Sequence, residues 1–189
     1  MSYRDTYDFW MTDDYFDEDT KKELAAIADD EAEIEDRFYR DLVFGTGGLR
    51  GVIGAGTNRM NVFTVRQATA GLAEYIKKTG HTERGVVIAY DSRHFSPEFA
   101  LEAAKVLCAN NIKVYLFESL RPTPELSFSV RHLHCIAGIV ITASHNPAKY
   151  NGYKVYGEDG GQMPLDAANA VTEEIRKTDM LTGPSVMDE

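Results

Sequence analysis

Apolar residues in the first part of the chain recur every three or four positions, the spacing of one face of an α-helix. Residues 20–23 match the Thr-x-x-Glu capping box, and Leu24 and Ile27 follow on one face of the helix that this box would open. A second helix is predicted at about 31–42, where apolar residues are four positions apart. Residues 1–43 are therefore predicted to form a two-helix arm that packs on the rest of the chain.

After residue 43 the pattern alternates between helical spacing and short apolar runs. A glycine-rich segment comes first, at 44–56. Helical spacing then predicts four helices, at about 64–80, 96–109, 124–133 and 165–177. Short runs rich in Val and Ile predict four strands, at 85–90, 112–117, 135–143 and 153–156.

Strands that alternate with helices predict an α/β fold with a mostly parallel sheet flanked by helices. We assign this α/β domain to residues 44–182 and a tail to residues 183–189. Ligands of such sheets gather at the carboxyl ends of the strands. Ser144 follows one predicted strand end and Asp91-Ser92-Arg93 follow another, so we expect both segments at the same edge of the sheet.

The net charge of −10 comes entirely from the arm, because residues 1–41 hold 15 acidic and 5 basic side chains whereas residues 42–189 hold 15 of each. This distribution argues against a nucleic-acid partner, which would need a basic surface, and leaves an anionic small substrate possible.

No apolar run approaches the roughly 20 residues of a membrane span, and the N-terminus lacks a signal-peptide pattern. We therefore expect no membrane partner and a cytoplasmic location. Cys108 and Cys135 are expected to be buried, reduced thiols.

Ser144 is the leading candidate for chemistry, because it stands at the end of an apolar strand next to His145 and Asn146 and close to Lys154. Pro147 ends regular pairing. The segment lacks the glycine-flanked elbow of a hydrolase nucleophile, so a hydroxyl that carries an anion fits it better. A serine that only terminates a strand is the alternative. His145 is poorly placed as a base for its own neighbour, and Lys154 is either a solvated charge or a proton carrier.

The sequence Phe-Gly-Thr-Gly-Gly-Leu-Arg-Gly at 44–51 is a second candidate. Its glycines could let successive backbone N–H groups converge on a phosphate, and Arg50 could fork onto the same group. It is not a Walker loop, because it lacks the GxxxxGK[ST] order, and nothing supports a nucleotide fold. A flexible loop between a helix and the sheet is the alternative.

Taken together, residues 44–51, residues 142–147 (Thr-Ala-Ser-His-Asn-Pro) and Asn151-Gly152-Tyr153-Lys154 resemble the signatures of the α-D-phosphohexomutase superfamily. Residues 54–61 and the acidic arm that contains Trp10 are most similar to the phosphoglucomutase branch, which includes phosphomannomutase and phosphopentomutase relatives. The resemblance runs over essentially the whole chain. It implies a mixed sheet flanked by helices and an enzyme that moves phosphate between the 1 and 6 hydroxyls of a hexose through a phosphoserine and a bisphosphate.

The resemblance also implies roles for individual residues. Ser144 would carry the phosphate, Arg50 would neutralise it, His145 and Asn146 would shape the loop and Lys154 would handle protons, with Ser144, Arg50, His145 and Lys154 as the catalytic set. The phosphate-binding set would be Thr46, Gly47, Arg50, Ser144, His145, Asn146 and Lys154. Mg²⁺ would bind Ser144 through its phosphate, and a hexose 1,6-bisphosphate would act as activator.

The aspartate-rich DGDxDR loop, which supplies the other metal ligands in this superfamily, does not occur in the sequence. The chain therefore resembles the N-terminal domain alone, inactive by itself, with a phosphorylated hexose and the missing C-terminal domains as its partners. A surface that those domains would cover could let the fragment self-associate. Glucose phosphate is the first expected substrate, and mannose and pentose phosphates are the alternatives. A non-catalytic module that binds phosphosugars or a partner domain is the alternative of another class.

Overall fold

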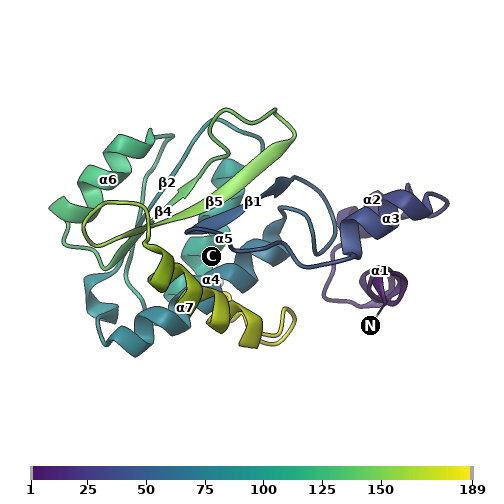
Figure 1. The fold of residues 1–189 in the computed structure, drawn as a ribbon, viewed down its shortest axis with the longest axis horizontal. Coiled ribbons are helices and arrows are strands. Elements are labelled where there is room, and N and C mark those ends of the chain that lie inside the picture. The colour runs from purple at the N-terminus through teal and green to yellow at the C-terminus, as the bar shows by residue number, and fades with distance from the viewer. Residues whose placement is uncertain (1, 188–189) are drawn as a thin grey trace.

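One five-stranded sheet forms the centre of the computed structural model, which describes residues 2–187 (Figure 1). The strand order is β1-β5-β4-β2-β3, with β1 at Gly48–Val52, β2 at Val86–Tyr90, β3 at Val114–Leu116, β4 at Ala137–Ile141 and β5 at Tyr150–Gly157. Strand β2 pairs in parallel with β3 and β4, whereas β5 is antiparallel to both of its neighbours, β4 and β1. All strands except β5 therefore point the same way, which confirms the predicted mixed, mostly parallel sheet.

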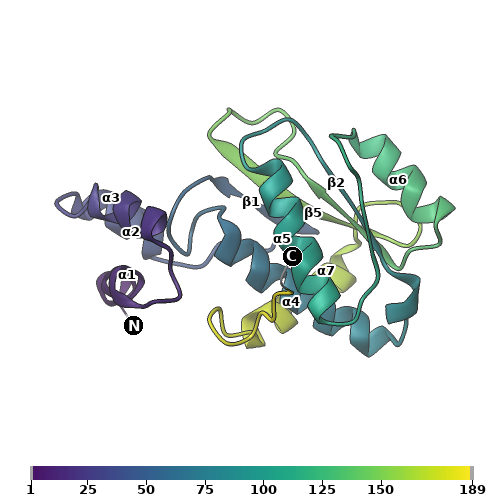
Figure 2. The same cartoon turned by 180° about the vertical axis from the view of Figure 1, so that it is seen from behind.

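Helices cover both faces of this sheet (Figures 1 and 2). Helices α4 (Val62–Thr79), α5 (Ser96–Ala109) and α7 (Leu165–Lys177) cover one face, and α6 (Thr123–His132) covers part of the other. A short 3₁₀ turn, η1 (Thr82–Arg84), precedes β2. Alternate side chains of β2 point to opposite faces, so that Ile88 joins the core under α4 and α5 while Val87 packs with Val130 of α6.

The predicted helices of the α/β domain agree closely with the observed ones. Helix α7 has the predicted bounds, and α4 ends where Gly80 adopts a left-handed φ of 76°, a conformation that glycine takes without a steric cost. Helix α4 begins two residues before the predicted start because Asn61 and Thr64 cap it reciprocally. Strand β5 starts three residues earlier than predicted, at Tyr150, because it pairs with both β1 and β4.

The arm departs from its prediction, because it contains three helices rather than two: α1 (Tyr3–Thr12), α2 (Glu18–Ala25) and α3 (Glu31–Phe38). Helix α1 was missed, although Ser2 and Asp5 form a capping box at its start. The proposed box at 20–23 is wrong, because Asp17 caps α2 and both box residues lie inside the helix. Helix α3 ends four residues before the predicted position, since the N–H of Leu42 donates to the Thr57 carbonyl.

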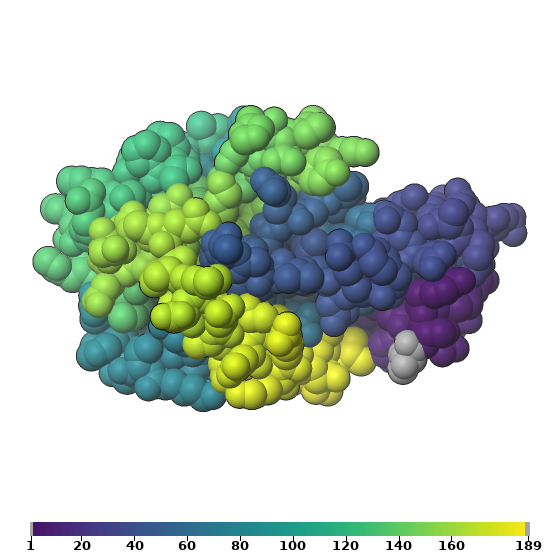
Figure 3. All heavy atoms as spheres, viewed as in Figure 1, coloured from purple at the N-terminus to yellow at the C-terminus, as the bar shows by residue number. Residues whose placement is uncertain are grey.

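An aromatic cluster joins the arm to the sheet domain. Trp10 stacks on Phe16 with ring centroids 4.2 Å apart, and both rings contact Phe63, which belongs to α4. Buried aromatic pairs of this kind contribute about 0.5–1.5 kcal/mol beyond their buried area. Arg37 of α3 adds ion pairs to Glu23 and Glu33 within the acidic arm. Figure 3 shows the arm in continuous contact with the rest of the molecule.

The glycine-rich segment 44–56 is only partly the loop that its composition suggested, since it contains β1. A Cβ on Gly48 would lie 2.1 Å from the Tyr153 carbonyl oxygen, so a side chain at this position would collide with β5. The glycine is needed for the close approach of two strands.

The predicted tail is described as far as Met187, whose N–H donates to the Lys105 carbonyl at 3.3 Å. Residues 188 and 189 of that tail, and Met1 of the predicted arm, lie outside the described residues. Within residues 2–187, none of the helices has the length and apolar character required to cross a membrane.

Gly71 sets the distance between α4 and α7, and its replacement by alanine should destabilise the chain. The new Cβ would lie 2.4 Å from Cγ1 of Ile175 and 2.7 Å from its backbone N. Overpacking of this kind costs about 1–3 kcal/mol, which exceeds the helix-propensity gain of about 1 kcal/mol. Urea unfolding should show a lower midpoint for Gly71→Ala.

Gly45→Ala is the matched control, because nothing lies within 4 Å of the Cβ that it adds. It should unfold like the original chain. The double variant Gly71→Ala/Ile175→Ala should not recover the stability, because the backbone of Ile175 also obstructs the new methyl group. Equal midpoints for Gly71→Ala and Gly45→Ala would contradict the packing described here.

Candidate active site

Ser144 lies in the loop that connects β4 to β5. The backbone leaves the sheet after Ile141 and turns sharply, so that Ser144 has a left-handed φ of 55° and an exposed side chain. Its N–H donates to Oγ1 of Thr142 at 2.9 Å, and the N–H of Asn146 donates to the Ala143 carbonyl at 3.1 Å. Non-glycine residues seldom adopt this conformation, and they do so where surrounding contacts hold it.

Lys154 contacts this serine from the middle of β5. Its Nζ donates to Ser144 Oγ at 2.6 Å. Burial lowers the pKa of Lys154, the nearby positive charge of Arg50 lowers it further, and the charge of Asp91 opposes them. A lysine with a lowered pKa exchanges its proton more readily near neutral pH than an ordinary surface lysine does.

Arg50 reaches the same place from β1. It pairs with Gly152 of β5, two residues from Lys154, and residues two apart on a strand share one face of the sheet. Arg50 is exposed, and its Nη1 donates to Asn146 Oδ1 at 3.3 Å. A Cβ on Gly152 would lie 2.6 Å from the Thr142 carbonyl oxygen, so only glycine fits between the two cations and the serine loop. The arrangement suits a group with negative charge on Ser144.

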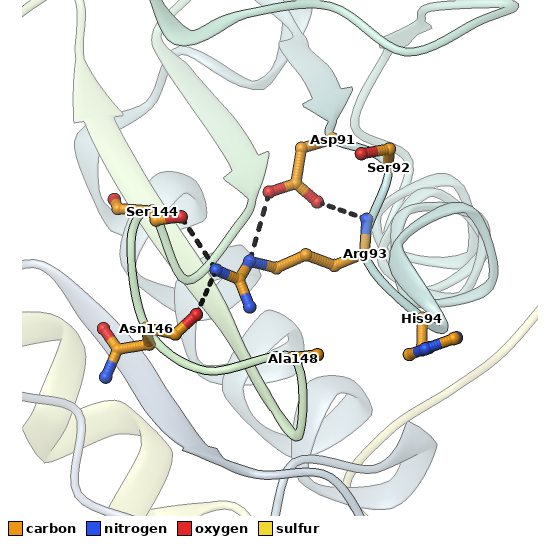
Figure 4. Close-up of a pocket in the computed structure, with 7 residues that line it drawn as sticks. All are labelled: Asp91, Ser92, Arg93, His94, Ser144, Asn146 and Ala148. Atoms are coloured by element: carbon orange, nitrogen blue, oxygen red, sulfur yellow. Dashed lines mark hydrogen bonds and ion pairs between the residues drawn. The ribbon is translucent and has the colours of Figure 1, made fainter.

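A second arginine holds the loop from the opposite side. Arg93, just after β2, extends its guanidinium into the curve of the loop that runs from Ser144 through Asn146 to Ala148 (Figure 4). Nη2 donates to the carbonyls of Ser144 at 2.7 Å and Asn146 at 2.6 Å. Nη1 donates to the carbonyls of Pro147 and Tyr150. Nε forms an ion pair with Asp91, 3.5 Å away.

The structure thus brings together four of the predicted site residues: Ser144, Lys154, Arg50 and Asn146. Thr46 lines a depression with Arg50 and Lys154, on the β1 side of the site. His145 is exposed beside Ser144 in the loop. The roles predicted for these residues remain predictions.

The backbone of the glycine segment is already engaged within the protein. The N–H of Gly47 donates to the Gly45 carbonyl at 2.7 Å, and its own carbonyl accepts from Val155 at 2.8 Å. The N–H of Gly45 donates to the Gly48 carbonyl. In a phosphate nest the N–H groups would converge on a free space, and these two do not. The predicted phosphate contact of Gly47 would therefore need another atom of this residue or a local change of the backbone.

The sequence predicted that Asp91 and Arg93 lie at the same edge of the sheet as Ser144, but it assigned no role to either residue. The carboxylate of Asp91 accepts from Thr142 Oγ1, from Ser96 Oγ and from the N–H of Arg93. An aspartate and an arginine two residues apart after a strand end are a weak signal. The carbonyls that they organise become visible only in three dimensions.

A complete magnesium site is not formed by residues 2–187, since they contain no group of three or more His, Cys, Asp or Glu side chains that could hold a metal ion. Asp91, the carboxylate beside the serine loop, is occupied by its hydrogen bonds and by Arg93. A phosphate on Ser144 would offer one ligand, and Mg²⁺ needs several oxygen ligands.

Comparison with known proteins gives a consistent result. The family model "Phosphoglucomutase/phosphomannomutase, alpha/beta/alpha domain I" matches residues 41–182. A phosphoglucomutase of Staphylococcus epidermidis is 51% identical over 137 residues, which are 72% of this chain and 25% of that protein. A phosphoglucomutase of Staphylococcus aureus is 47% identical over 149 residues, which are 78% of this chain and 27% of that protein. The chain thus spans about a quarter of the length of these relatives.

Solved structures agree in fold. A putative phosphomannomutase from Thermus thermophilus superposes with a TM-score of 0.67 at 31% identity, over 79% of this chain and 33% of that one. A phosphoglucomutase/phosphomannomutase family protein from Burkholderia thailandensis gives a TM-score of 0.62 at 26% identity, over 77% of this chain and 32% of that one. With its family model matched across the sheet domain and the serine loop, the chain belongs to the phosphoglucomutase/phosphomannomutase family and carries its α/β/α domain I.

Proposed function

We propose that this chain is the phosphoserine-bearing domain of a phosphoglucomutase, which interconverts hexose 1-phosphate and 6-phosphate through a bisphosphate. The observation that carries the proposal is the 2.6 Å contact between Lys154 Nζ and Ser144 Oγ, beside the exposed guanidinium of Arg50. A hydroxyl between one proton-exchanging cation and one permanent cation can both hold a phosphoryl group and release it.

The transfer needs little from the protein beyond position and charge. The phosphorus–oxygen bond to Ser144 breaks as a new bond forms to a sugar hydroxyl, and the proton of that hydroxyl ends on Ser144 Oγ. Lys154 lies where it can deliver this proton, and its lowered pKa leaves more of the neutral amine, the form that can accept a proton in the reverse step. Arg50 offsets the negative charge of the phosphoryl group. His145 and Asn146 are proposed to shape the loop.

Glucose phosphate is the proposed substrate, since the relatives at 47–51% identity are named phosphoglucomutases. Mannose phosphate is supported less, by the putative phosphomannomutase at 31% identity, and pentose phosphate by resemblance alone. The groups that read the sugar would belong to parts of the protein beyond this chain. The same parts would complete the Mg²⁺ site, and a hexose 1,6-bisphosphate would prime Ser144.

Several exposed apolar side chains are candidates for contacts with those further parts. Phe95, at the start of α5, and Phe128, on α6, are 52% and 56% exposed.

A non-catalytic module that only binds phosphosugars would need the same loop. It would differ by never acquiring a phosphate on Ser144.

Ser144→Ala should abolish the activity of the full-length polypeptide encoded by the source gene. Loss of a covalent carrier lowers turnover by about three orders of magnitude or more. Formation of glucose 6-phosphate from glucose 1-phosphate measures the activity, and intact mass after treatment with glucose 1,6-bisphosphate measures the phosphate on Ser144. The surface variant Ser185→Ala should behave like the original protein. Full activity of Ser144→Ala, or an unmodified Ser144 in an active enzyme, would reject the proposal.

Lys154 should lose its proton at lower pH than Lys22 and Lys177, whose pKa values are raised by acidic neighbours, and Arg50→Gln should shift the titration of Lys154 toward higher pH. Arg50 contributes to the lowered pKa through its positive charge, after burial. An NMR titration of the lysine side-chain nitrogens would measure both effects. Arg121→Gln, on an arginine that pairs with Glu125, is the control and should leave Lys154 unchanged.

The lowered pKa of Lys154 also makes the free energy of unfolding depend on pH. Between the lowered pKa and the ordinary value of 10.5, the unfolded chain binds the lysine proton and the folded chain does not. The contribution of Lys154 to the free energy of unfolding therefore rises with pH in this window. Arg50→Gln should flatten that rise, and a steeper rise would contradict the assignment.

A further inference from the structure

We propose that Arg93 is a positioning residue for phosphoryl transfer, which holds Ser144 in its left-handed conformation without contacting the phosphate. This inference rests on the proposed function of Ser144 and adds a residue to it. It starts from the two arginines that flank the serine loop, because the structure uses them in different ways.

The donors of Arg93 are fully engaged within the protein. A guanidinium has five N–H groups; Nη1 and Nη2 of Arg93 donate to four backbone carbonyls, and Nε forms an ion pair with the Asp91 carboxylate. Its side chain is only 14% exposed. A phosphate could bind Arg93 only if the loop released these contacts. Arg50, by contrast, is exposed and gives one bond to Asn146, so it is the arginine that can meet a ligand.

Three of the four carbonyls come from the serine loop, and the fourth belongs to Tyr150, the first residue of β5. Ser144, Asn146, Pro147 and Tyr150 all turn their carbonyl oxygens toward the same guanidinium. Without Arg93 these oxygens would turn to water, and the backbone at Ser144 could relax from its φ of 55° to the extended region that serine prefers. That change would carry Ser144 Oγ away from Lys154.

Asp91 anchors Arg93 and the serine loop to two regular elements of the fold. Its carboxylate accepts from the backbone N–H of Arg93 at 2.9 Å and from Oγ of Ser96, the first residue of α5. It also accepts from Thr142 Oγ1, which in turn accepts the N–H of Ser144. The loop is therefore held to the end of β2 and the start of α5. Sites supported by rigid elements keep their geometry better than sites on free loops.

The test compares Arg93→Gln with Arg84→Gln. Arg84 is a matched control, because it also donates to two backbone carbonyls, of His134 and Cys135, and makes an ion pair, to Glu158, but at the opposite end of β2. Arg93→Lys keeps the charge without the planar fork, so it should recover only part of the loss. It also tests the proposal if Arg93→Gln does not fold.

Hydrogen exchange on this chain reads the loop directly. Arg93→Gln should speed exchange of the amides at 144–146 by about tenfold or more, whereas Arg84→Gln should leave them unchanged. In the full-length enzyme, kcat should fall about 100-fold in Arg93→Gln, the effect of a misplacement of about 1 Å, with KM changed less than about threefold. The kcat of Arg84→Gln should stay within about threefold of the original.

Three results would overturn the inference. The first is unchanged exchange or kcat in Arg93→Gln, the second is an equal loss in Arg84→Gln, and the third is a raised KM with unchanged kcat, which would make Arg93 a substrate ligand. The proposed function itself fails in another way, since the original protein would then carry no phosphate on Ser144. The exchange result does not depend on that outcome.

Discussion

The reversed strand β5 is the constraint on which the candidate site depends. Because it runs antiparallel between β4 and β1, its connection to β4 is a short loop rather than a helical crossover, and this loop carries Ser144. The same strand carries Lys154 and fixes the register of Arg50 opposite Gly152. A slip of β5 by one residue would turn Lys154 to the other face of the sheet, away from Arg50. The hydrogen bonds of one strand thus determine the chemistry of the loop beside it.

Much of the fold was predictable from the sequence, because its determinants are local. Helix α7 has an unbroken apolar stripe, and Gly80 ends α4 by its own conformational freedom. Strand β1 was missed because glycines carry no hydrophobic pattern, and its pairing depends on contact with distant Tyr153. Helix α1 was missed for a related reason. Its buried residues depend on partners elsewhere in the chain, since Tyr7 packs on Phe38 and Trp10 on Phe16 and on Phe63 of α4.

The candidate site also contains residues that local motifs predict and contacts that only the fold creates. Ser144, Arg50 and Lys154 were identified because they stand in motifs that can be read along the chain, and the structure brings them together. The sequence placed Arg93 at the carboxyl edge of the strands, but it did not predict which carbonyls Arg93 would bind. Every residue has a backbone oxygen, so the sequence does not distinguish those that an arginine will contact. The expected phosphate nest stays a prediction. Glycines permit such a nest, but the N–H groups of Gly45 and Gly47 donate to carbonyls of the same turn.

The open position of Ser144 has a consequence for the fate of a phosphate attached to it. Helix α6 covers the part of its face over β2 and β4, and the side chain of Ser144 is exposed to solvent. Water is present at about 55 M and is a competing acceptor wherever a site cannot exclude it. The negative charge of a phosphoserine would oppose attack by water, but the cations around Ser144 would offset that charge. For the proposed mutase, exclusion of water from the loop would therefore decide between phosphate transfer to a sugar and slow hydrolysis of the phosphoserine.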